Sequence, residues 1–289
     1  MLSLNIEEHT VGIVGLGLMG GAFAYALRRL SARRILACDI SAQTLKAAQK
    51  EGCIDEAFLK TDAMLGQCDL VFFCLNPAIV THVIRDSMTL FKHGALLTDI
   101  TGIKLPIVQA LEPIIRPDID FIPGHPMAGS EKGGFECAKQ CSFLNKNYIL
   151  TPLAHNKPEH IQFLKQLIYR MGFSRITETT AHDHDKNIAF TSQLCHIIAS
   201  ALIHCQQNTA ITHFGGGSFE DLTRIALLNV PLWTELFLEN RDNLIEQITC
   251  FEQSLDLLKQ LINTNNEPAL KEILDTVRKR RSAMAEQQR

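Results

Sequence analysis

The chain has 289 residues, which is enough for one large domain or two smaller ones. Hydrophobic residues make up 46% and charged residues 20% of it, the composition of an ordinary soluble globular protein. The formal net charge of −3 gives no electrostatic reason to expect nucleic acid as a partner. No apolar run reaches the roughly 20 residues that span a bilayer, so no membrane segment is expected.

The sequence favours a cytoplasmic location. The first residues include Glu7 and Glu8 and lack the apolar core of a signal peptide. The nine cysteines are irregularly spaced, as expected of thiols that stay reduced.

Two groups of possible metal ligands are discounted. Cys137 and Cys141 are not accompanied by a second pair of ligands. His182, His184 and Asp185 crowd together at a predicted helix start, where neighbouring side chains do not share a face. The sequence therefore predicts no metal site.

The first half of the chain alternates short apolar runs with helical patterns. This alternation predicts an α/β domain with a doubly wound, mostly parallel sheet of the Rossmann type, covered by helices on both faces. The predicted strands cover residues 11–16, 34–39, 69–75, 95–99, 121–122, 148–150 and 173–179, and the first two predicted helices cover residues 19–30 and 41–51.

The second half changes character, because no convincing strand follows residue 181. Helical patterns cover residues 183–206, 219–228, 231–263 and 268–285. In the third of these, apolar residues recur at steps of three and four and form one stripe, which fits either ordinary core or a subunit interface. We therefore expect a dinucleotide-binding domain over residues 1–180 and a helical domain over residues 181–289.

A glycine fingerprint follows the first predicted strand. Gly15 permits a tight turn, Gly17 lets a pyrophosphate approach the backbone, and Gly20 lets the next helix pack on the sheet. The N-terminus of that helix offers free N–H groups to phosphate. The alternative is a glycine-rich turn that binds no nucleotide. The predicted cofactor site also includes Leu18, Met19, Leu75, Asn76 and Pro77.

Asp39 ends the second predicted strand. Its carboxylate is placed to accept hydrogen bonds from the adenosine ribose hydroxyls and to repel a 2′-phosphate. No arginine follows it directly, so the sequence favours NAD over NADP.

His125 follows the predicted strand at residues 121–122 and is held extended by Pro126. An imidazole with an ordinary pKa near 6.5 suits proton transfer at neutral pH. A histidine in a turn is usually structural. Its expected place beyond the strand ends, beside the nicotinamide, favours a catalytic role.

The predicted helix 183–206 carries a polar stripe on an otherwise apolar segment. Buried polar side chains need partners, which a substrate pocket or a set of interhelical hydrogen bonds would supply. Both interpretations stay open. The stripe consists of Asp185, Ala189, Ser192, Gln193, His196 and Ser200.

Three glycines, Gly215 to Gly217, precede a short predicted helix that contains Arg224. An arginine binds a carboxylate with two parallel hydrogen bonds. The structural alternative is an ion pair with Asp221 or Glu220 one turn away.

These segments together resemble the prephenate/arogenate dehydrogenase family of tyrosine biosynthesis. The resemblance covers nearly the whole chain. It implies a Rossmann domain followed by an all-helical domain through which two copies form a homodimer. The residues that carry it are 15–21, 124–131, 191–196, 215–224 and Trp233.

The resemblance implies NAD-dependent oxidative decarboxylation of prephenate to 4-hydroxyphenylpyruvate, or of arogenate to tyrosine. His125 would polarise the substrate hydroxyl, and Arg224 would hold a substrate carboxylate; these two are the expected catalytic residues. Further substrate contacts are implied for Thr101, Ser192, Gln193, His196, Gly217, Asp221 and Trp233.

Three positions depart from the family pattern. Gly102 stands where a loop serine is common, Gln193 replaces the first histidine of a Ser-His-Leu-Pro-His stretch, and Cys195 replaces its proline. Glutamine carries no charge, so the change at position 193 bears on the choice between a keto acid and an amino acid side chain.

Two rival interpretations remain. β-Hydroxyacid dehydrogenases and imine reductases also join a Rossmann domain to helices, and they use a lysine or aspartate on the first long interdomain helix, where this chain has Lys186. A catalytically silent NAD sensor is the other rival. The residues at 124–131 do not match the first group, and His125 with Arg224 argues against the second.

Overall fold

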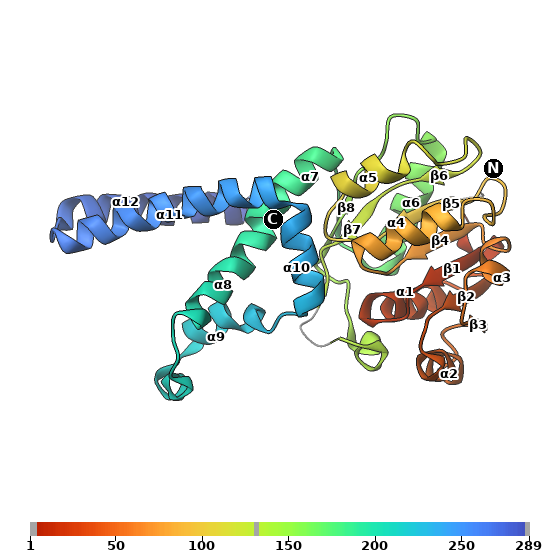
Figure 1. Ribbon diagram of the computed structural model, residues 1–289, viewed down its shortest axis with the longest axis horizontal. Helices are drawn as coiled ribbons and strands as arrows, with labels where there is room; N and C mark the ends of the chain where they lie inside the picture. Colours follow the sequence, from red (N-terminus) through yellow and green to blue (C-terminus); the bar gives the residue numbers. More distant parts are fainter. Residues whose placement is uncertain (1–4, 130–132, 287–289) are drawn as a thin grey trace. The chain divides into compact units, whose positions relative to one another are not determined.

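The structure is a computed structural model that describes residues 5–129 and 133–286 (Figure 1). The chain forms two compact units, Met1–Asn240 and Arg241–Arg289. We describe each unit separately.

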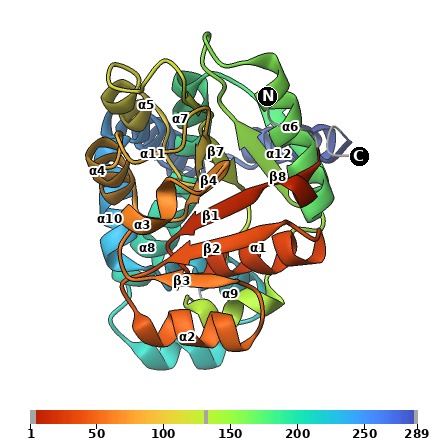
Figure 2. The ribbon, with the colours of Figure 1, turned by 90° about the vertical axis from the view of Figure 1, so that its right-hand side faces the viewer.

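A six-stranded sheet forms the centre of the first unit, in the order β3-β2-β1-β4-β5-β6. Every neighbouring pair is parallel, which confirms the predicted doubly wound Rossmann architecture. Figure 2 shows β3, β2, β1 and β4 side by side. The strands are β1 (Thr10–Val14), β2 (Arg34–Cys38), β3 (Glu56–Phe58), β4 (Leu70–Phe73), β5 (Leu96–Asp99) and β6 (Asp120–Phe121).

Helices cover both faces of this sheet. Successive residues of a strand point to opposite sides, so the strands contribute to two apolar clusters. In β4, Leu70 and Phe72 join one apolar cluster, whereas Val71 and Phe73 join the other. The first cluster includes residues of α1 (Leu18–Arg29), α2 (Ala42–Lys50) and α6 (Pro158–Met171), and the second includes residues of α3 (Asp62–Leu65), α4 (Pro77–Asp86) and α5 (Leu105–Leu111).

A second sheet contains β7 (Gly124–Pro126), β8 (Asn147–Leu150) and β9 (Arg175–Glu178), with β7 antiparallel to β8. Strands at 148–150 and 173–179 were predicted, but their separation from the first sheet was not. The last ladder bond of the first sheet runs from Ile122 N to Leu97 O at 2.9 Å. Pro123 follows and has no N–H to continue the ladder. His125 thus follows the end of β6 in the chain, as expected, but it lies inside a further strand, β7, that was not predicted.

The helices of residues 181–240 include a π-helical turn at Ala189–Gln193, inside the single helix predicted for residues 183–206. The helix predicted over residues 231–263 is wrong as one element, because α10 ends before Asn240. The other elements of this part are α7 (Ala181–Ile188), α8 (Leu194–His204), α9 (Gly217–Thr223), α10 (Val230–Glu239) and short 3₁₀ turns at Thr209–Phe214 and Arg224–Ala226. Two further 3₁₀ turns lie earlier in the chain, at Ile6–Glu8 and Phe135–Gln140.

The second unit is a helical hairpin of α11 (Arg241–Asn263) and α12 (Glu267–Glu286) (Figure 1). Asn265 makes the turn with a φ of 50°. The apolar stripe predicted for this region is open in the single chain, where Leu255 is 53% and Ile262 is 63% exposed. No helix within residues 5–129 and 133–286 is long and apolar enough to cross a membrane.

Candidate functional site

The glycine turn lies at the point where the strand order reverses, between β1 and β4. Gly15 has a φ of 92°, and a Cβ there would lie 2.5 Å from the carbonyl oxygen of Cys74. A Cβ at Gly20 would lie 1.9 Å from the Gly15 oxygen, so α1 packs directly on the turn. Both positions therefore exclude any residue with a side chain.

The N-terminus of α1 fits a phosphate group. Gly17 is its N-cap, makes no side-chain capping bond, and has no protein atom within 4 Å of the place a Cβ would take. Leu18 and Met19 follow at the first helical positions and are half-buried. A backbone that a ligand can approach, at the positive end of a helix, is the arrangement that holds pyrophosphates.

Asp39 joins the ends of β1 and β2. Its Oδ2 accepts a hydrogen bond from Leu16 N at 2.7 Å, and its Oδ1 accepts one from Ser41 N at 2.8 Å. Each carboxylate oxygen has a further lone pair. The group is half-exposed, so it retains acceptor capacity for ribose hydroxyls while its orientation is fixed.

The segment Leu75–Pro77 follows β4, across the switch point from β1. Asn76 is the N-cap of α4 without a side-chain capping bond, and Ala78 N donates to Glu235 Oε1 at 2.5 Å. Two helix N-termini thus begin at the switch point, where doubly wound sheets bind their ligands.

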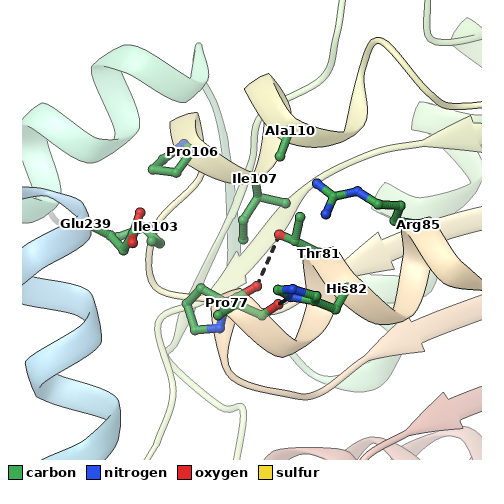
Figure 3. Close-up of a pocket in the computed structure, with 10 residues that line it drawn as sticks. Pro77, Thr81, His82, Arg85, Ile103, Pro106, Ile107, Ala110 and Glu239 are labelled. Atoms are coloured by element: carbon green, nitrogen blue, oxygen red, sulfur yellow. Dashed lines mark hydrogen bonds between the residues drawn. The ribbon is translucent and has the colours of Figure 1, made fainter.

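A cavity of about 200 Å³ lies beside this segment (Figure 3). Among the predicted cofactor residues, Pro77 lines it, and His125 is not among its lining residues. Its wall consists of Pro77, Ala78, Thr81, His82, Arg85, Ile103, Pro106, Ile107, Ala110 and Glu239.

His125 is half-buried and contacts a second histidine. Its Nδ1 lies 2.9 Å from Nε2 of His184, whose own Nδ1 lies 2.7 Å from Oδ1 of Asp185. Burial, His184 and Lys104 together hold the pKa of His125 well below its usual 6.5. The imidazole is consequently neutral at neutral pH and accepts protons.

The contact of His184 with His125 was not predicted from the sequence, where His184 was considered only as a metal ligand and set aside. His184 lies 59 residues from His125, and nothing local to α7 indicates that the two rings meet. Tertiary packing alone brings them together.

A buried ion pair supports the same region. Lys104 has a side chain that is 0% exposed and donates from Nζ to Asp99 Oδ2 at 2.5 Å. Burial lowers the pKa of Lys104, and Asp99 opposes that shift. Thr101 is buried in this network, where its hydroxyl accepts from Lys104 Nζ at 3.0 Å. The predicted substrate contact of Thr101 stays a prediction.

Gly102 lies close to the Nε2 atom of His125. A Cβ at Gly102 would lie 3.9 Å from Nε2 of His125 and 3.2 Å from Cδ2 of Leu236. Leu236 therefore fills the space that a side chain at position 102 would need.

The polar stripe predicted on helix 183–206 was expected either to line a substrate pocket or to form interhelical hydrogen bonds, and its residues differ in this respect. Gln193 is buried, donates from Nε2 to Leu236 O at 2.9 Å, and accepts from Asn240 Nδ2 at 2.8 Å. Interhelical hydrogen bonding thus engages both ends of its amide. Ser192 and His196 are half-exposed, and the His196 ring stacks on Trp233 at 3.6 Å between centroids.

The remaining predicted residues lie around α9. Gly217 is its first residue, Asp221 lies within it, and Arg224 begins the 3₁₀ turn that follows; all three are exposed in the single chain. In the histidine motif at 124–131, Ser130 and Glu131 lie outside the described residues.

The fold and the switch-point glycine turn, with a neutral imidazole nearby, define a dinucleotide-dependent dehydrogenase. Family profiles refine this class. One described as "Prephenate dehydrogenase, nucleotide-binding domain" matches residues 23–176, and one described as "Prephenate dehydrogenase, dimerization domain" matches residues 180–276. The chain belongs to the prephenate dehydrogenase family, as its motifs predicted.

The two compact units of the structure divide after Asn240. The predicted domain boundary at residue 180 is a different division of the chain, and it stays a prediction.

Individual relatives are similar over most of their length. A prephenate dehydrogenase of Bacillus subtilis is 28% identical over 90% of this chain and 71% of its own. A prephenate dehydrogenase of Aquifex aeolicus, solved with hydroxyphenyl propionate and NAD+, is 30% identical with a TM-score of 0.86, over 95% of this chain and 98% of that one. Arogenate dehydrogenase of Synechocystis is 25% identical with a TM-score of 0.77, over 95% and 99%.

Proposed function

We propose that this chain catalyses the NAD-dependent oxidative decarboxylation of prephenate to 4-hydroxyphenylpyruvate, or of arogenate to tyrosine. The observation that carries the proposal is the pair of family matches, which together span residues 23–276 apart from three residues between them. The likeness to a relative solved with hydroxyphenyl propionate and NAD+ supports the same chemistry.

The cofactor would be held by the glycine turn and the residues around it. NAD held there would supply the acceptor for the hydride that leaves the ring carbon bearing the substrate hydroxyl. The α1 N-terminus at Gly17 would hold the pyrophosphate, and Asp39 would bind the adenosine ribose. The segment Leu75–Pro77 would line the opposite side of the switch point.

His125 would act as the base. Because burial and its neighbours keep its pKa low, the neutral ring can accept the hydroxyl proton as the C–O bond becomes a carbonyl. The ring carboxylate then leaves as CO₂, and the electron pair of the broken bond makes the ring aromatic. The ring oxygen recovers a proton in the same step. Aromatisation favours this cleavage, so the protein chiefly has to position hydride and proton.

The helical part would bind the rest of the substrate. We place Arg224 on a substrate carboxylate, since a guanidinium fixes both charge and orientation. His196, stacked on Trp233, would present one ring edge to the ligand, with Ser192 and Gly217 beside it. Asp221 would orient Arg224 from one turn away. Gln193 would then contribute through the packing of its helix, because its amide is already engaged.

Two copies would associate through the helical domain. The dimerization profile covers residues 180–276, and Leu274 and Val277 on α12 are 54% and 56% exposed in the single chain, beside the open apolar residues of α11. Exposed apolar surface of this kind is typical of a subunit interface. We further propose a cytoplasmic location for this biosynthetic enzyme.

The test is NADH formation by the purified protein with NAD and either prephenate or arogenate. We expect turnover of at least one, and the ratio of kcat/KM values decides which substrate is preferred. The matched control is His125→Asn, which should lose most turnover while retaining NAD affinity. A protein that binds NAD but turns over neither compound would contradict the proposal and favour the sensor or the hydroxyacid and imine enzymes.

A further inference from the structure

We propose that His184 and Asp185 are positioning residues that fix His125 in the tautomer with its proton on Nδ1 and its lone pair on Nε2. The assignment of this lone pair to the substrate hydroxyl rests on the proposed function. The tautomer itself rests on three contacts in the first unit: the backbone of α5 to Asp185, Asp185 to His184, and His184 to His125.

Backbone hydrogen bonds fix the Asp185 carboxylate independently of its contact with His184. Its Oδ1 accepts from Lys104 N and its Oδ2 accepts from Leu105 N, each at 2.8 Å, at the start of α5. The side chain is only 2% exposed. An ionised carboxylate has acceptors alone, so any third partner has to be a donor.

His184 is that third partner. Its side chain is 0% exposed, and its Nδ1 lies 2.7 Å from Asp185 Oδ1, so Nδ1 carries the proton. Burial lowers the pKa of His184, and Asp185 opposes that shift without reversing it. A neutral imidazole has one proton, which leaves the Nε2 of His184 as an acceptor.

The proton on His125 follows from the same logic. The Nε2 of His184 has no proton and lies 2.9 Å from Nδ1 of His125, so Nδ1 of His125 donates. The lone pair of His125 is then on Nε2, the atom that borders Gly102. This is the atom that a substrate hydroxyl must reach.

Position 102 offers no alternative means of orientation. Gly102 has no side chain to hydrogen-bond Nε2, and the aliphatic tip of Leu236 fills the adjacent space. The ring of His125 is thus oriented from its Nδ1 side, through a chain of buried groups that ends on backbone N–H groups. Such a chain resists rotation, because breaking it leaves a buried polar group unpaired.

The first experiment reads the tautomer without any substrate. Protein labelled with ¹⁵N-histidine is studied by NMR at a pH where His125 is neutral, and the His125 signals are assigned from their loss in His125→Asn. We expect a protonated Nδ1 and a bare Nε2. A wild-type protein with the His125 proton on Nε2 would overturn the proposal.

The second experiment compares two substitutions of the middle residue. His184→Leu removes the acceptor, whereas His184→Gln places an amide oxygen near the position of Nε2. We expect the leucine variant to lose the Nδ1 tautomer and about 10- to 100-fold in kcat, a part of the roughly 10²–10⁴-fold that a positioned base supplies. The KM and dissociation constant for NAD should stay unchanged. The glutamine variant should regain most of kcat and the Nδ1 proton.

A matched control is His93→Gln, at a side chain that is 90% exposed, which should change neither readout. If His184→Leu does not fold, as judged by thermal melting, the proposal is tested by the His125 tautomer in the wild-type spectrum and by the Nδ1 proton and kcat of His184→Gln. An unchanged tautomer and kcat in a folded His184→Leu would overturn the proposal. Failure of the wild type to oxidise prephenate and arogenate would instead refute the proposed function and leave the tautomer result standing.

Discussion

Asn240 and Gln193 form a buried amide pair across two helical segments. Asn240 Nδ2 donates to Gln193 Oε1 at 2.8 Å and to Asp185 O at 2.9 Å. The pair joins the residue that follows α10 to the π-helical turn before α8. Because Asp185 also supports His184, this contact connects the end of α10 to the segment that orients His125.

Gln193→Leu is expected to lower stability without changing substrate preference. The substitution removes the buried amide that donates to Leu236 O and accepts from Asn240 Nδ2, so two hydrogen bonds of about 0.5–1.5 kcal/mol each are lost. Thermal melting should show a lower Tm, and the prephenate-to-arogenate ratio of kcat/KM should match the wild type. The exposed amide substitution Gln67→Leu serves as a control. A large change in the substrate ratio with an unchanged Tm would instead place Gln193 on the substrate.

Activity is expected to fall on the acid side only below pH 6.5. The base must be neutral, and the pKa of His125 is held below its ordinary 6.5 by burial, His184 and Lys104. The charged and titratable groups around it are His184 and Asp185 on α7, Asp99 at the end of β5, and Lys104 at the N-cap of α5. A plot of log kcat against pH checks this. A decline in log kcat that begins above pH 6.5 would contradict a lowered pKa of His125 as the cause.

Stability should follow the same direction. The pKa values of His125 and His184 are lower in the folded protein than in the unfolded chain, so the unfolded state binds more protons below pH 6.5. The free energy of unfolding therefore decreases as the pH falls from 6.5 toward the folded pKa values. Melting curves over this range, compared with those of His184→Gln, measure the contribution of one ring.

The sequence predicted the parallel sheet and the glycine turn because their signals are local. The strands within residues 69–75 and 95–99 are buried on both faces of the sheet. Such strands appear in a sequence as continuous apolar runs, and these runs predicted them. Gly15 and Gly20 are required by close backbone approaches within one turn. β3 and α3 were missed because three or four residues are too few to show a period.

The arrangement around His125 was less predictable because it depends on contacts distant in sequence. β7 leaves the first sheet after Pro123 and pairs with β8, which no local pattern indicates. His184 meets His125 through tertiary packing. The break at Asn240 has a similar origin, since its side chain replaces helix continuation with hydrogen bonds to Asp185 and Gln193.

Asp39→Ala is expected to reduce the preference for NAD over NADP. The variant removes the carboxylate that would bind the ribose and repel a 2′-phosphate, so kcat/KM should fall with NAD and rise with NADP. It also removes bonds to Leu16 N and Ser41 N, which lowers stability. Asp55→Ala is a matched control, because Asp55 accepts from Ile35 N at 2.7 Å elsewhere on β2. That variant should lose stability and retain the wild-type NAD-to-NADP ratio. A fully NAD-selective Asp39→Ala would contradict the ribose role.

Arg224→Ala is expected to weaken substrate binding more than it slows chemistry. Hydrogen bonds to charged groups contribute about 1.5–3 kcal/mol, so KM for the substrate should rise roughly tenfold or more. Arg224→Lys should recover part of the loss, because lysine retains the charge without the planar pair of donors. Steady-state kinetics with Arg278→Ala, at a side chain that is 76% exposed on α12, provides the control. An unchanged KM in Arg224→Ala would assign this arginine to ion pairing within α9 rather than to the substrate.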